Sequence, residues 1–162
     1  MDPGPAVMLP GMSRIAEVIV LAQDADEAME PLTRYDDSRS WKGIFYAMSP
    51  GGNYGFGWGA EFVRVGSRTG LLRHLESLPW PRPETVQVLI HDEEDDCFGL
   101  WMIHDGKLVE IPLPRTRRAY WSGPYDDPGD PPDPGVLCRT DSRPIEWPEE
   151  NEGGDRSRPP AW

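Results

Sequence analysis

The run IAEVIVLA at residues 15–22 decides the fold expected for this chain. Its apolar and β-branched residues are nearly continuous, which is typical of a strand that is buried on both faces. A short helix is expected next, because Asp24 and Glu27 have the spacing of a capping box and Pro31 offers a stop. We therefore place this strand at the centre of a sheet, with a helix directly after it.

Five more strands and one more helix follow from the pattern along the chain. The second helix is expected to begin at the cap Ser67, to carry leucines on one face and to end at Pro79. The dipeptide Asp105-Gly106 predicts a two-residue type I′ hairpin, because glycine tolerates the positive φ that this turn needs. The expected strands lie at residues 41–48, 54–65, 85–91, 97–104 and 107–111.

The resulting order, β-α-β-β-α-β followed by a β-hairpin, predicts an α+β domain. It matches the ferredoxin-like plan, in which two helices cover one face of a sheet. Right-handed crossovers place the strands at 15–22 and 54–65 side by side in the middle. We expect a disordered N-terminal extension at residues 1–12, the α+β domain at 13–114 and a largely irregular tail at 115–162.

Proline content and charge set the expectations for the tail and for the partner. Residues 123–162 hold nine prolines and five glycines, which is typical of a solvated chain end, with Leu137 among its candidate anchors. The formal net charge is −12, and acidic residues outnumber basic ones in residues 12–122 (17 to 12) and in residues 123–162 (10 to 4). A field of this sign disfavours nucleic acids and anionic lipids and favours a basic protein partner.

The sequence shows no sign of secretion or of a membrane span. No apolar run approaches the roughly 20 residues that a spanning helix needs, and the start MDPGPAVMLPG lacks the features of a signal peptide. The two cysteines, Cys97 and Cys138, make neither a disulfide framework nor a metal cluster. We therefore expect a cytoplasmic protein with reduced thiols, no metal and no cofactor.

The segment NYGFGWG alternates aromatic residues with glycines. In a strand, Tyr54, Phe56 and Trp58 share one face and the glycines share the other. Two interpretations stay open. Either bulky neighbours such as Trp41 or Trp101 fill the glycine side, or the three aromatics form a contact surface for a partner. Stacking on RNA is disfavoured, because no basic residue precedes the glycines.

The turn DEEDD gathers five carboxylates between two predicted strands. We expect it to be too charged to be buried, and to face solvent or a basic partner. His91 and His104 lie near it in the sequence, but the spacing of the ionisable residues matches no metal motif. The residues of the turn are Asp92, Glu93, Glu94, Asp95 and Asp96.

These features predict a non-catalytic acidic binding protein, an inhibitor or immunity-type protein that occludes a basic site on a partner protein. No catalytic residue is assigned, because neither a G-x-S-x-G elbow nor a phosphate-binding loop is present. The predicted contacts are Tyr54, Phe56, Trp58 and the DEEDD turn. The alternatives are an accessory subunit of a larger phage or secretion-type assembly and a domain that binds a small ligand or carbohydrate. An enzyme is the least favoured class.

Overall fold

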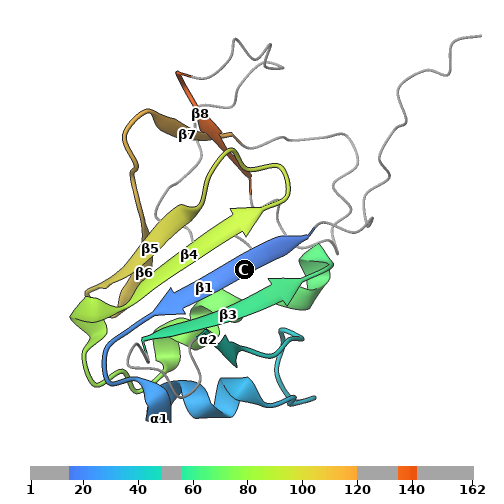
Figure 1. Ribbon diagram of the computed structural model, residues 1–162, viewed down its shortest axis with the longest axis vertical. Coiled ribbons are helices and arrows are strands. Elements are labelled where there is room, and N and C mark those ends of the chain that lie inside the picture. The colour runs from blue at the N-terminus through green and yellow to red at the C-terminus, as the bar shows by residue number, and fades with distance from the viewer. Residues whose placement is uncertain (1–14, 49–55, 120–134, 142–162) are drawn as a thin grey trace, which may run out of the picture.

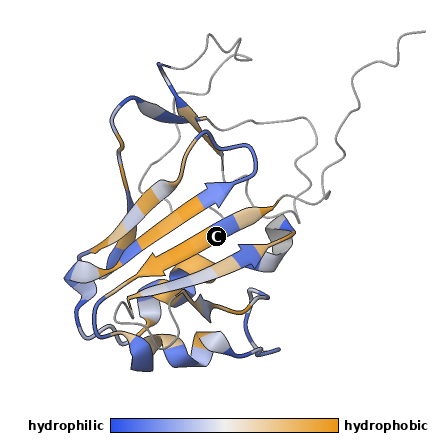
Figure 2. Ribbon diagram, viewed as in Figure 1, coloured by the Kyte–Doolittle hydropathy of each residue, from blue (hydrophilic) through white to orange (hydrophobic). Residues whose placement is uncertain are grey.

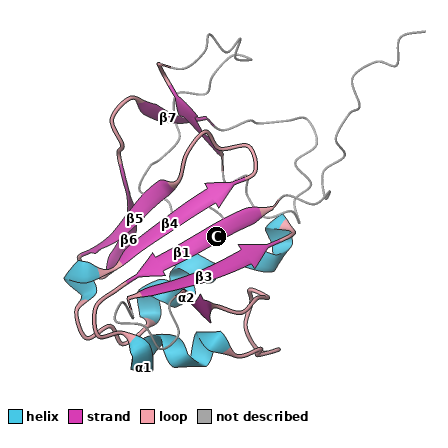
Figure 3. Ribbon diagram, in the orientation of Figure 1, coloured by secondary structure: helices cyan, strands magenta, loops and turns pink. Residues whose placement is uncertain are grey.

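The computed structural model describes residues 15–48, 56–119 and 135–141 (Figure 1). The elements are β1 (Ala16–Leu21), α1 (Asp26–Met29), η1 (Glu30–Thr33), β2 (Tyr46–Ala47), β3 (Gly57–Phe62), η2 (Val65–Arg68), α2 (Leu71–Ser77), η3 (Pro83–Thr85), β4 (Gln87–Asp92), β5 (Gly99–His104), β6 (Lys107–Ile111), β7 (Thr116–Ala119) and β8 (Val136–Arg139). Six strands form one sheet in the order β2-β3-β1-β4-β5-β6, and β7 pairs with β8 in a separate small sheet (Figure 3).

The large sheet is antiparallel throughout, and β1 lies in its middle between β3 and β4. The α+β class and the predicted neighbourhood of the first and third strands are therefore confirmed. The exact ferredoxin-like plan stays a prediction, since β2 is only two residues long and β5 and β6 extend the sheet. The two-residue hairpin is also present, because Asp105 and Gly106 have φ values of 48° and 75°.

The core lies on one side of the sheet, where α1 and α2 pack. Alternate residues of β1, β3 and β4 point into it, as the period of a strand requires. The fully buried side chains include Val18, Val20, Met29, Leu32, Phe62, Leu71, Leu72, Leu75, Val88 and Ile90. In Figure 1, α2 lies behind the sheet.

Trp41 lies within this core and contacts several of its aromatic and polar side chains. Its ring meets Phe45 and Phe62 edge to face, with centroids 5.8 and 6.2 Å away. The indole N–H donates to Nδ1 of His74 on α2 at 2.8 Å, and the Arg39 guanidinium lies 4.0 Å from the ring centre. The predicted strand at 41–48 is therefore reduced to Tyr46–Ala47, because its first half turns into the core and does not extend along the sheet.

Both predicted helix caps are wrong. Asp24 has a φ of 54° and precedes the actual N-cap, Ala25, so its carboxylate caps no helix. Ser67 lies inside η2, and α2 starts after Gly70, whose φ of 82° is in the left-handed region. A residue with a side chain disfavours this backbone conformation, which explains the glycine at the start of α2.

The glycines of β3 lie on the face opposite the core. A Cβ on Gly57 would stand 3.1 Å from Sδ of Met48 and 3.2 Å from Cδ2 of Leu21. Bulky side chains therefore do fill the glycine side, but they are Met48 and Leu21 and not the two predicted tryptophans.

We expect Gly99→Ala to lower the free energy of unfolding by about 1–3 kcal/mol, because the core is already filled at this point. The added Cβ would lie 2.8 Å from Cζ3 of Trp101 and 3.1 Å from Nη2 of Arg118. Gly59→Ala is the matched control, since its Cβ would meet only Cγ of Met48 at 3.9 Å. In urea denaturation it should be unchanged or up to about 1 kcal/mol more stable. A Gly99→Ala variant as stable as the wild type would contradict the tight packing.

A second prediction concerns pH. The hydrogen bond from the Trp41 indole needs an unprotonated Nδ1 on His74. Burial is the main cause that lowers the pKa of His74 from 6.5, and the charge of Arg39 lowers it further. The unfolded chain then binds more protons below this value, so the protein loses stability as pH falls through 6.5. In His74→Asn the amide oxygen keeps an acceptor that does not titrate. The stability of the wild type relative to this variant should decline from pH 8 to pH 5, and an increase would refute the assignment.

Candidate functional site

The face of the sheet that α1 and α2 leave open carries aliphatic side chains. Residues of an antiparallel strand normally alternate, so that those on the face toward water are polar. Here the register aligns Ile19, Leu89, Leu100 and Ile111 in one row across β1, β4, β5 and β6. We call this side the open face and define its apolar part as Ile19, Leu21, Leu89, Leu100, Met102, Val109 and Ile111, all partly buried.

The open face is not covered by any helix or strand of the described part of the chain (Figure 1). Figure 2 shows that β1 and β4, the two central strands, carry the most continuous hydrophobic colour. Exposed Tyr46 and Met48 extend the surface past the glycines of β3, because Tyr46 is the register partner of Gly59. A contiguous apolar surface of this kind is typical of an interaction site.

Two opposed carboxylates mark one end of the open face. Glu17 on β1 and Glu61 on β3 are register partners, and both are exposed. Directly opposite residues have Cβ atoms about 4.5–5.5 Å apart, and like charges repel at this distance. Among the ion pairs of the described residues, none involves either side chain. We call Glu17 and Glu61 the glutamate pair.

The acidic turn differs from its prediction, because two of its carboxylates are buried. Asp92 forms an ion pair of 2.6 Å with Arg68, and both side chains are 1% exposed. Asp95 accepts hydrogen bonds from the backbone N–H groups of Asp92 at 2.9 Å and of Leu137 at 2.7 Å. The expectation that the turn is too charged to be buried is wrong for these two residues. A guanidinium and backbone donors compensate their charge.

The turn binds β8 along its edge. The N–H of Asp96 donates to the carbonyl of Leu137 at 2.8 Å, and the N–H of Arg139 donates to Oδ2 of Asp96 at 2.8 Å. Leu137 is buried, so its predicted role as an anchor of the tail is confirmed. Burial raises the pKa of the Asp95 carboxyl, although the two hydrogen bonds oppose this shift. Part of the segment expected to be irregular is therefore the ordered sheet of β7 and β8.

The other acidic residues of the turn reach solvent. Glu93, Glu94 and Asp96 are exposed, and Oε2 of Glu93 accepts the N–H of Ile15 at 3.2 Å. These three side chains still form an acidic surface, but they lie at the edge of the molecule where β8 docks. The main role of the turn in the structure is therefore to hold β8.

The aromatic candidates are separated. Trp58 is 4% exposed and points into the core, so it is lost from the predicted contact surface. The alternation of β3 turns its aromatic side toward the helices, which the sequence pattern alone does not reveal. Phe56 is 46% exposed just before β3, and Tyr54 lies outside the described residues.

His91, His104 and the two cysteine thiols lie in separate environments. Nε2 of His91 lies 3.0 Å from the carbonyl oxygen of Asp95, whereas His104 stands on the exposed hairpin turn. Burial raises the pKa of the Cys97 and Cys138 thiols, which lowers their nucleophilic fraction at neutral pH. Within the part of the chain that is described, His, Cys, Asp and Glu side chains form no group of three that could hold a metal ion.

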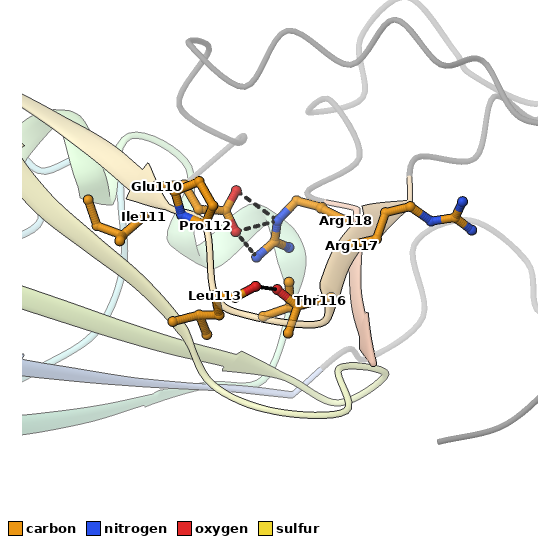
Figure 4. A pocket seen from close by; sticks show the side chains of 8 residues that line it. Glu110, Ile111, Pro112, Leu113, Thr116, Arg117 and Arg118 are labelled. Atoms are coloured by element: carbon orange, nitrogen blue, oxygen red, sulfur yellow. Dashed lines mark hydrogen bonds and ion pairs between the residues drawn. The ribbon is translucent and has the colours of Figure 1, made fainter. Parts of the chain in front are cut away.

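A shallow pocket lies between β6 and β7 (Figure 4). Its cavity volume of about 20 Å³ suits a water molecule and not a substrate. The Arg118 guanidinium points into it and binds both oxygens of Glu110, with Nε–O distances of 2.9 and 3.1 Å. The contact between Arg118 of β7 and Glu110 of β6 therefore joins the small sheet to the large one.

Comparison with known proteins gives no relative: no family model, no curated protein and no solved structure matches the chain. Over the described residues, every helix is too short or too polar to cross a membrane.

The sequence alone does not predict the open face, although it contains a signal for it. The run at 15–22 is apolar at nearly successive positions, which indicates burial on both faces. The strand at 85–91 carries Val86, Val88 and Ile90 on one side, but Leu89 adds an apolar residue to the other side. Only one face is covered by described helices. The surplus of apolar residues in these two strands was the signal.

We expect Asp95→Asn to reduce the hydrogen-exchange protection of the Leu137 amide by about tenfold or more. Asparagine keeps one acceptor oxygen but turns an NH₂ group toward the second backbone donor. Glu94→Gln is the control, because Glu94 is exposed and makes no hydrogen bond or ion pair to a described residue. Equal protection in the two variants would show that the Asp95 carboxylate does not hold β8.

Proposed function

We propose that this protein is a non-catalytic binding protein of the cytoplasm that holds a basic partner protein against its open face, as an inhibitor or immunity protein does. The observation that carries the proposal is the aliphatic open face, whose side chains lie where polar residues are normally found. The formal net charge of −12 supports the occlusion of a basic functional site on the partner.

The apolar open face and the negative charge of the molecule have different physical roles in the proposed binding. Burial of apolar area contributes about 25 cal/mol per Å², so the row of Ile19, Leu89 and Leu100 supplies affinity. The excess of acidic residues steers a positively charged partner and raises the association rate more than it raises affinity. Nucleic acid is disfavoured as a partner, because phosphate carries the same sign of charge.

The positions of the ionisable groups support binding over catalysis. The carboxylates of Asp92 and Asp95 are already used for the ion pair with Arg68 and for the docking of β8. His104 is separated from the acidic turn by the whole length of β5. Proton transfer would need such groups to converge on one substrate atom.

A second candidate function is that of an accessory subunit in a larger assembly. The same open face favours it, because an apolar face of a sheet can pack on a neighbouring subunit. We also assign the first four strands to the ferredoxin-like plan, which the antiparallel order β2-β3-β1-β4 supports. This assignment concerns the fold alone, since such folds carry unrelated functions.

The test is affinity capture with a double variant of the open face, Leu89→Asn with Leu100→Asn. Immobilised wild type should retain a basic protein from the source lysate, and the capture should be slower at about 0.5 M salt than at low salt, because charges are then screened. The double variant should retain at least about tenfold less of it, which corresponds to roughly 1.4 kcal/mol.

Tyr35→Ser is the control, since Tyr35 is 60% exposed but lies outside the open face. Circular dichroism and urea denaturation must show that all variants are folded. Equal retention by the double variant would refute the open face as the binding surface. A wild type that elutes as an oligomer, and a double variant that elutes as a monomer, would support the assembly subunit instead.

A further inference from the structure

We infer that the open face receives an amphipathic helix of the partner, and that an arginine or lysine of this helix lies between Glu17 and Glu61. This inference rests on the proposed function and adds the chemistry of the partner. It is carried by the register of the strands, which joins an apolar surface directly to the glutamate pair.

The geometry of the open face consists of rows that run across the strands. One row holds Ile19, Leu89, Leu100 and Ile111, and the next row along β1 holds Glu61, Glu17 and His91. Side chains two residues apart on a strand are about 6.6–6.8 Å apart. The carboxylate of Glu17 is therefore an immediate neighbour of the aliphatic surface.

This proximity means that an occupant must bring a positive charge. A helix that covers the aliphatic row also removes water from the glutamate pair, and a desolvated carboxylate is costly unless it is paired. His91 does not meet this need in the structure, because its Nε2 contacts the carbonyl of Asp95 and its ring packs at a tilt against Phe98, with the centroids 5.0 Å apart. A guanidinium or ammonium group from the partner satisfies both carboxylates.

A helix fits this surface better than an added strand does. An added strand needs a free sheet edge, but β6 offers a poor one. The N–H of Leu108 donates to Oε2 of Glu76 at 3.0 Å, and Pro112 follows the strand directly. At the other edge, β2 has only two residues. The broad apolar stripe of a helix, in contrast, covers a sheet face, as α1 and α2 do on the opposite side.

A second copy of this chain is a poorer occupant. Two open faces packed together would bring two glutamate pairs into one interface, and their like charges would be partly desolvated. A basic amphipathic helix has no such cost. The charge of the molecule and the composition of its open face therefore favour the same partner.

The experiment uses two synthetic helical peptides of equal length with the same leucine stripe, one with arginine and one with glutamine at its polar positions. Fluorescence anisotropy measures their Kd for the full chain, and amide chemical shifts locate the contact. The arginine peptide should bind the wild type more tightly than the glutamine peptide, and its shifts should map to β1, β4 and β5.

The decisive variant is Glu17→Gln with Glu61→Gln. Its matched control is Asp24→Asn with Glu27→Gln, which removes the same charge from exposed positions outside the open face. We expect the Kd of the arginine peptide to rise about tenfold in the first variant and less than about twofold in the control.

The outcomes separate the two proposals. If Leu89→Asn with Leu100→Asn abolishes binding but the glutamate variant behaves like its control, the open face is the site and the inferred cation contact is wrong. If the arginine peptide does not bind the wild type, or neither variant weakens it, the inference fails. Shifts that map elsewhere in the wild type also count against the proposed function.

Discussion

The buried ion pair between Arg68 and Asp92 is the interaction on which the rest of the structure depends. It joins η2 to the last residue of β4 with both side chains 1% exposed. A buried pair adds little net stability, because desolvation offsets the attraction, but the loss of one partner leaves an uncompensated charge and costs about 3–5 kcal/mol. The pair therefore specifies geometry. It fixes the start of the acidic turn, and the turn in turn offers Asp95 and Asp96 to the backbone of β8.

The carboxylates of this acidic chain thus have two distinct functions, which net charge alone does not separate. Asp92 and Asp95 are compensated and hold elements together. Glu17 and Glu61 lie opposite each other without compensation among the described residues, beside an aliphatic surface. A repulsive pair of this kind weakens the sheet slightly. In the binding that we propose, its position next to the open face gives it a role in recognition, because a partner that covered it would have to neutralise it.

The sequence predicted the features that depend on neighbouring residues and failed for those that depend on distant ones. The central strand and the Asp105-Gly106 hairpin follow from local periodicity and turn chemistry, and both are present. The docking of β8 depends on a contact between Asp95 and Leu137, 42 residues apart, which no local pattern reveals. For the same reason the local pattern places the whole acidic turn at the surface. The open face is not evident from the sequence, because apolar residues at successive positions indicate burial on both faces of a strand.

The aliphatic residues of the open face are not required by the fold itself. The core on the helix side is complete, with Trp41, Phe62 and Leu72 fully buried. Polar residues in place of Leu89 and Leu100 would leave that core intact and would lower the tendency of the open face to associate nonspecifically. Repulsion between acidic copies opposes such association, whereas a basic partner is attracted. In the proposed complex, the same negative charge that opposes association between copies would therefore also select the partner.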